Sequence, residues 1–210
     1  MVPMKISLSD TGKRYNREWI FRHLSYTFES GNHYALTGFN GSGKSTLLQI
    51  LAGSLTHSEG LVQYETAGHS IEPQQVYQHI SIAAPYLELP EEMTLQEFLS
   101  FHFCFKNILP GIRIESIIQT IGLEKAAHKQ IRNFSSGMKQ RAKLAQAVFA
   151  DTPAVFFDEP CTNLDTEGIN LYHRLVEHYC SNRLVVVSSN DEEEYRFCRF
   201  VLPVSRYKTN

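Results

Sequence analysis

The stretch "GFNGSGKST", Gly38 to Thr46, decides the fold of this 210-residue chain. It satisfies the pattern G-x-x-x-x-G-K-[ST] and lies between a predicted strand, "HYALTG", and a predicted helix, "KSTLLQILAG". Its glycines let the backbone curl with the N–H groups turned inward, and the following helix adds the positive end of its dipole. Such a loop cradles phosphate groups, so the sequence predicts a P-loop nucleotide site in an α/β domain.

Each residue of this phosphate loop is a candidate nucleotide ligand, and two have particular roles. Lys44 is expected to reach the β- and γ-phosphate oxygens of ATP, and the Ser45 hydroxyl is expected to bind Mg²⁺. An ordinary turn would not require three glycines and then a lysine followed directly by two hydroxyl residues. The candidate nucleotide-binding residues of the loop are Gly38, Phe39, Asn40, Gly41, Ser42, Gly43, Lys44, Ser45 and Thr46.

A pair of acids, Asp158 and Glu159, follows the apolar run "AVFF" in "AVFFDEP". The run predicts a buried strand, and Asp158 would emerge at its C-terminal end, where α/β proteins bind ligands. Asp158 is expected to hold Mg²⁺ through water, and Glu159 to polarise an attacking water. Two acids after a strand are usually only a solvated strand end, but the phosphate loop favours the functional interpretation.

Composition and charge exclude several other classes of protein. The formal net charge is -2 and no Lys/Arg-rich run is present, so we expect no nucleic-acid partner. No apolar stretch approaches the roughly 20 residues of a spanning helix, and "MVPMKISLSD" does not resemble a signal peptide. The four cysteines are scattered without a C-x-x-C pair, which argues against disulfides and zinc. A cytoplasmic protein is expected.

The order of predicted elements indicates one domain with an insertion. The first forty residues contain short strands and turns, typical of an antiparallel β patch. Strands then alternate with helices, which predicts a mixed-sheet α/β core formed by residues 1–86 and 135–210. Residues 87–134 are predicted to form a helical subdomain. There Thr94 and Glu97 are spaced as a capping box ahead of "FLSFHFCF".

Two further motifs, in the expected order, extend this pattern over nearly the whole chain. "FSSGMKQR", Phe134 to Arg141, resembles the signature motif of the ATP-binding-cassette (ABC) family of ATPases, and "CTNLD", Cys161 to Asp165, resembles its D-loop. The chain is similar in length to compact bacterial members such as haem-exporter ATPase subunits. The resemblance implies a head-to-tail homo- or heterodimer with two ATP molecules in its seam. Each ATP would contact the phosphate loop of one protomer and the signature motif of the other.

The resemblance also assigns ligands outside the phosphate loop. Ser135, Ser136 and Gly137 begin a helix, whose N-terminus suits a γ-phosphate, although Ser135 is equally an ordinary helix cap. Asp165 of the D-loop is included among the nucleotide-binding candidates. Tyr15 occupies the place of an aromatic that stacks on adenine, and the alternative is an exposed loop tyrosine.

Three motifs depart from the family pattern. Asn190, after the strand "LVVVS", falls where the family has a histidine that contacts the γ-phosphate, so we expect Asn190 to be a weaker catalytic contact. The alternative is that Asn190 caps the acidic helix "DEEEY". Pro85 replaces a glutamine that touches Mg²⁺. In the signature motif, Ser136 replaces a glycine and Met138 replaces a glutamine. Together these changes predict slow hydrolysis with intact nucleotide binding.

The leading hypothesis for function is an ATP-hydrolysing subunit that drives a membrane transporter and lies at the inner membrane through an integral membrane partner. Coupling to that partner is expected near residues 85–105. In "FLSFHFCF", Phe98 and Phe101 are predicted to share a helix face that Phe103 and Phe105 do not both join. Most of these phenylalanines are expected in the core, and the remainder are expected to line a groove that binds a helix of the partner.

Three alternatives use the same phosphate loop. A cassette ATPase acting on nucleic acid or ribosomes usually carries two cassettes or coiled-coil inserts, whereas this chain has one cassette and no heptad run. A nucleotide sensor with little hydrolysis agrees with the departures but not with the presence of Lys44, Asp158 and Glu159. A small-molecule kinase would need neither the signature motif nor the D-loop.

Overall fold

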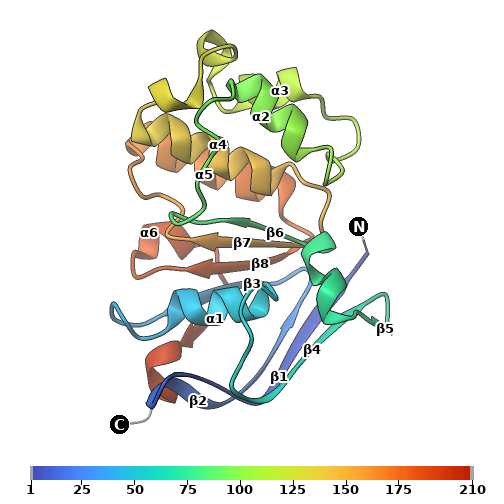
Figure 1. Cartoon of the computed structure of the whole chain (residues 1–210), viewed down its shortest axis with the longest axis vertical. Helices are drawn as coiled ribbons and strands as arrows, with labels where there is room; N and C mark the ends of the chain where they lie inside the picture. Colours follow the sequence, from blue (N-terminus) through green and yellow to red (C-terminus); the bar gives the residue numbers. More distant parts are fainter. Residues whose placement is uncertain (1, 209–210) are drawn as a thin grey trace. The chain divides into compact units, whose positions relative to one another are not determined.

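The computed structural model describes residues 2–208 and divides into two compact units, which Figure 1 displays in sequence colours. The first unit is formed by residues 2–82, 152–158 and 182–208, and the second by Ala83–Asp151 and Glu159–Ser181. The predicted helical insertion, residues 87–134, falls within the second unit, and its separation as a subdomain stays a prediction. Within residues 2–208, no helix combines the length and the apolar character needed to cross a bilayer.

The antiparallel sheet of the first unit has the strand order β2-β1-β4-β5. Its strands are β1 (Met4–Tyr15), β2 (Glu18–Glu29), β4 (Glu59–Thr66) and β5 (His69–Ser70). The antiparallel patch is confirmed, but β1 and β2 are single long strands where several short ones were predicted. Irregular pairing lets them continue: Asp10 and His23 adopt φ values of 49° and 56°, and their side chains meet at 2.7 Å. Asp10 and His23 are polar residues that suggest a turn in the sequence, but in the structure they lie in bulges of continuous strands.

The second sheet of this unit has the order β6-β7-β8-β3-β9. Its strands are β3 (His33–Thr37), β6 (Ile80–Ala83), β7 (Ala154–Asp158), β8 (Leu184–Ser188) and β9 (Phe200–Pro203). The pairs β7–β8, β8–β3 and β3–β9 are parallel. Because every residue of β7 and β8 is buried, these strands are continuous apolar runs without alternation. The α/β fold class is therefore confirmed.

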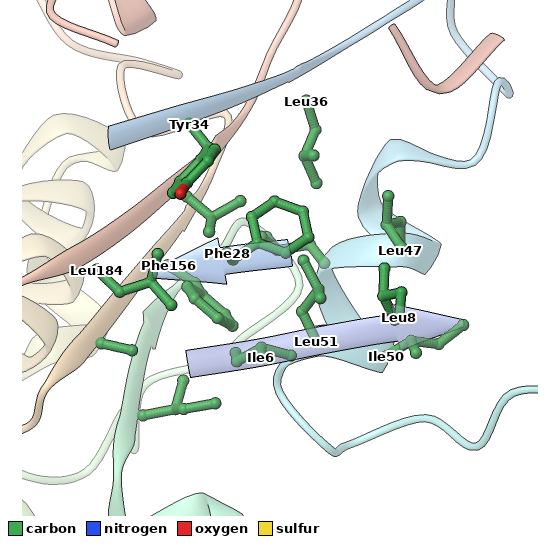
Figure 2. Packing of buried hydrophobic residues seen from close by; sticks show 14 of the residues in the cluster. Ile6, Leu8, Phe28, Tyr34, Leu36, Leu47, Ile50, Leu51, Phe156 and Leu184 are labelled. Atoms are coloured by element: carbon green, nitrogen blue, oxygen red, sulfur yellow. The ribbon is translucent and has the colours of Figure 1, made fainter. Parts of the chain in front are cut away.

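The hydrophobic core of the first unit joins the two sheets to the helix α1 (Lys44–Leu51). Figure 2 shows side chains from β1, β2, α1 and the parallel strands converging there, among them Ile6, Phe28, Leu47, Phe156 and Leu184. All five are at most 3% exposed, so each contributes about 1.5–3 kcal/mol of burial free energy. This packing fixes α1, and with it the end of the phosphate loop.

The registers of the parallel strands place three sequence-distant residues in line at one edge of the sheet. Leu36 of β3 pairs with Ser188 of β8, and Ser188 pairs with Asp158 of β7. The loops that follow these strands must therefore start side by side. This edge is where open α/β sheets bind ligands.

The second unit is helical. It contains α2 (Leu95–His102), α3 (Ile114–Thr120), α4 (Ser136–Val148) and α5 (Thr166–Tyr179). The predicted capping box at the start of α2 is confirmed: Thr94 Oγ1 accepts from the Glu97 N–H at 3.2 Å, and Glu97 Oε2 accepts from the Thr94 N–H at 2.8 Å. Short 3₁₀ turns, at Glu124–Ala126 and Ile131–Asn133, connect α3 to α4.

The prediction that most phenylalanines of "FLSFHFCF" belong to the core is wrong. Phe98 is 4% exposed, but Phe101 is 49% and Phe105 is 73% exposed. Because α2 ends at His102, Phe103 and Phe105 lie beyond the helix and its periodicity does not apply to them. The rings of Phe101 and Phe105 pack against each other instead, with their centroids 5.1 Å apart.

Candidate functional site

The phosphate loop runs from the end of β3 into α1, as predicted. Gly38, Gly41 and Gly43 have φ values of 138°, 82° and 96°, which L-residues rarely adopt. A Cβ atom on Gly43 would also lie 2.5 Å from Cγ2 of Ile20 in β2. Gly43 is therefore required by both conformation and packing, and it sets the direction in which α1 begins.

Lys44 is nearly buried, with 6% of its surface exposed. Its ammonium Nζ donates to the carbonyl oxygen of Gly38 at 2.8 Å, which keeps the charge within the loop. Ser42 is fully buried, and its hydroxyl oxygen has no hydrogen-bond partner among residues 2–208. A buried polar atom left unpaired costs about 1–3 kcal/mol, so these groups suit a polar ligand held by the loop.

Asp158 ends β7 beside the loop and is 2% exposed. Burial raises the pKa of its carboxyl group, while the Ser188 and Ser45 hydroxyls and the Lys44 ammonium act in the opposite direction. One carboxylate oxygen, Oδ1, lacks a hydrogen-bond partner in the described part of the chain. Hard divalent cations take oxygen ligands of this kind, so Asp158 and Ser45 fit the Mg²⁺ that accompanies a nucleotide.

Asn190 follows β8, and its side chain contacts the phosphate loop. Its Oδ1 accepts from the Gly38 N–H at 3.2 Å, and its Nδ2 donates to Asn40 Oδ1 at 3.1 Å. Asn190 does not cap the acidic helix α6 (Glu192–Tyr195): that cap is Asp191, which accepts from the Glu193 N–H at 3.0 Å. Of the two interpretations of Asn190, the structure excludes the helix cap.

Tyr15 ends β1 and is 48% exposed. Lys13 Nζ lies 5.0 Å from the centroid of its ring, within the range of a cation–π interaction. The same hairpin carries Trp19, the only tryptophan of the chain, whose ring lies 4.2 Å from Arg22 Cζ. Stacking of Tyr15 on adenine stays a prediction.

The remaining candidates belong to the second unit. Glu159 has an exposed side chain and a φ of 44°, a strained conformation for a residue with a Cβ atom. Ser135 caps α4 by accepting from the Met138 N–H at 3.3 Å, which confirms the cap expected there. The structure brings the signature and D-loop candidates together around a cavity of about 300 Å³. The candidate residues that line it are Ser135, Ser136, Gly137 and Asp165.

Two residues of α4 that sequence reasoning missed hold this second group together. Gln140 is 4% exposed, and its Nε2 donates to the carbonyl oxygen of Pro160 at 2.6 Å. Arg141 lies 3.6 Å from Asp165 Oδ1 through its NH2 atom. The sequence signal for Gln140 was a polar side chain on a helix face that is otherwise mostly apolar. Between them, these residues tie the start of α4 to both ends of the Pro160–Asp165 segment.

Pro85, at the place of the family's glutamine, is exposed and offers only its carbonyl oxygen, which accepts from Lys143 Nζ at 2.8 Å. Burial lowers the pKa of the Lys143 ammonium group, and the neighbouring charge of Lys139 adds to the shift. The side chain of Pro85 therefore cannot hydrogen-bond a cation's water shell.

Comparisons with known proteins agree with this arrangement. A family model described as "ABC transporter" matches residues 21–162. An uncharacterized ABC transporter ATP-binding protein of Bacillus subtilis is 28% identical over 211 residues, covering 95% of this chain and 92% of that protein. A cytochrome c biogenesis ATP-binding export protein of Agrobacterium fabrum is 27% identical, with 90% of each covered. The fold matches a dimeric bacterial ABC transporter cassette with a TM-score of 0.80 at 20% identity, over 95% of both chains.

Proposed function

Because the chain belongs to the ABC transporter family, we propose that it is the ATP-binding and ATP-hydrolysing subunit of a membrane transporter. The observation that carries the proposal is the phosphate loop, Gly38–Thr46, with Lys44 and the buried Asp158 carboxylate beside it. Glycines in left-handed conformations, an ammonium and an unpaired carboxylate oxygen together suit a metal-bound triphosphate.

Within this proposal the residues of the first unit bind the nucleotide. The loop N–H groups and Lys44 hold the phosphates, Ser45 and Asp158 hold Mg²⁺, and Tyr15 offers its ring to the base. When bound, Mg²⁺ would offset the charge that develops on the transferred phosphoryl group. Asn190 stands at the place of the family's histidine, and its neutral amide is proposed not to supply the contact that an imidazole would make with the third phosphate.

Hydrolysis requires a group that orients and deprotonates water, and Glu159 is the proposed base. Its strained backbone supports this role, because such strain gathers at functional positions. Ser135–Gly137 and Asp165 are proposed to contact ATP bound to a neighbouring subunit, either a second copy or a related chain. Their common cavity supports a shared ligand surface.

Transport requires a membrane partner, and the test is where the chain resides in its cell. The tagged chain is expected in the membrane fraction, released by alkaline carbonate but not by low salt, as a peripheral subunit would be. Mild detergent should extract it together with an integral membrane protein. A chain found only in the soluble fraction, or sedimenting with ribosomes, would contradict the transport role and favour the nucleic-acid alternative.

The departures at Asn190 and Pro85 predict slow turnover. The combined variant Asn190→His and Pro85→Gln is expected to raise kcat by about tenfold, because a chargeable imidazole and an amide restore two contacts to the reacting phosphate and its metal. Steady-state phosphate release measures the change. Equal kcat values for the variant and the wild type would show that these positions do not limit the rate.

A further inference from the structure

The side chain of Asn190 joins two residues of the phosphate loop that are more than 140 positions away in sequence. It accepts from the Gly38 N–H at 3.2 Å and donates to Asn40 Oδ1 at 3.1 Å. Gly38 is also held from its other side, because its carbonyl oxygen accepts from Lys44 Nζ at 2.8 Å. The first glycine of the loop is therefore fixed through both of its peptide groups.

The backbone determines the orientation of both amide side chains. The Gly38 N–H only donates, so the Asn190 atom that faces it must be the carbonyl oxygen. The Asn190 NH₂ group then faces Asn40 and must donate, which makes the Asn40 atom an oxygen as well. Each hydrogen bond has one donor and one acceptor, and no other assignment satisfies both contacts.

The segment that carries Asn190 is itself firmly anchored. The Ser189 N–H donates to the Leu36 carbonyl oxygen at 3.1 Å, which ties the segment to β3 just before the loop begins. The Asp191 N–H donates to Ser189 Oγ at 2.9 Å, and Ser189 is 2% exposed. Because the residues before and after Asn190 are both hydrogen-bonded, its side-chain amide is well placed to fix the more exposed phosphate loop that it contacts.

We propose that Asn190 is a positioning residue, which holds the phosphate loop in its nucleotide-binding shape through Gly38 and Asn40. This inference rests on the proposed function, since it concerns the same nucleotide site. A positioning role and a direct contact with the third phosphate predict different effects. The shape of the loop serves every phosphate that the loop cradles, so the affinities for ADP and ATP should depend equally on the Asn190–Asn40 bridge. A contact with the third phosphate would affect ATP alone.

The test is a double-mutant cycle on nucleotide affinity. Asn40→Ala, Asn190→Ala and the double variant are titrated calorimetrically with MgADP and with a non-hydrolysable ATP analogue. Each single substitution is expected to weaken both nucleotides about threefold, as the loss of an exposed neutral hydrogen bond predicts. The double variant should lose much less than the product of the single effects, because either substitution already breaks the bridge.

Asp191→Ala is the matched control: Asp191 is the next residue, and its side chain caps α6 by accepting from the Glu193 N–H. It is expected to leave both affinities unchanged, and thermal melting of each variant checks that the fold is retained. Weakening of the ATP analogue alone, unchanged ADP affinity, or fully multiplicative single effects would each overturn the inference while leaving the proposed function in place. A folded wild-type chain that binds neither nucleotide would instead overturn the proposed function.

Discussion

The Lys44→Ala chain is expected to bind MgATP about 100-fold more weakly than the wild type, the largest loss of affinity that a single substitution in this protein should produce. The reason is charge. Lys44 is 6% exposed, and its ammonium lies inside the phosphate loop, 2.8 Å from the Gly38 carbonyl oxygen. A cation from the solvent would therefore not readily take its place. Hydrogen bonds between charged groups contribute about 1.5–3 kcal/mol each, and Lys44 is expected to reach two phosphates. Calorimetric titration measures the loss.

The matched control for this substitution is Lys129→Ala, which removes an equal charge from an exposed position in the second unit. It should bind MgATP like the wild type. Circular dichroism and thermal melting establish that Lys44→Ala still folds. A folded Lys44→Ala chain with wild-type affinity for ATP would contradict the assignment of Gly38–Thr46 as the nucleotide site.

Glu159→Gln is expected to lower ATP hydrolysis by at least about 100-fold while leaving MgATP binding intact. The substitution keeps the shape of the side chain and removes only its ability to accept a proton. Bound ATP would then persist, so the variant should elute as a dimer in gel filtration with MgATP and as a monomer without it. Phosphate release and elution volume measure the two effects independently.

Glu177→Gln provides the comparison, because Glu177 is an exposed acid of α5 with no assigned role. Its hydrolysis and its elution should match those of the wild type. Undiminished hydrolysis by Glu159→Gln would exclude Glu159 as the base. Elution as a monomer under both conditions, with hydrolysis lost, would argue against pairing between identical copies and would favour a different chain as the partner.

The features that sequence analysis predicted correctly are local ones. The phosphate loop can be recognised from neighbouring residues alone, because its glycines and its helix start are specified within nine positions. The buried strands β7 and β8 and the cap at Thr94 are likewise written in short runs. These features agree with the structure because nothing distant in the chain competes with them.

The features that were missed depend on distant contacts or on where an element ends. The Asn190–Asn40 hydrogen bond spans 150 positions and arises only because β3 and β8 are parallel neighbours. The length of β1 and β2 depends on bulges at Asp10 and His23, where polar residues also suggest a turn. The exposure of Phe105 depends on where α2 ends, and a propensity argument rarely fixes a helix end.

The hairpin formed by β1 and β2 has a practical consequence through its tryptophan, Trp19. The side chain of the next residue, Ile20, lies against Gly43, so Trp19 is the sequence neighbour of a residue that packs on the phosphate loop. As the chain has no other tryptophan, all of its tryptophan emission comes from this one place. The protein thus carries an intrinsic optical probe in the hairpin next to the loop, and no dye need be attached to follow it in solution.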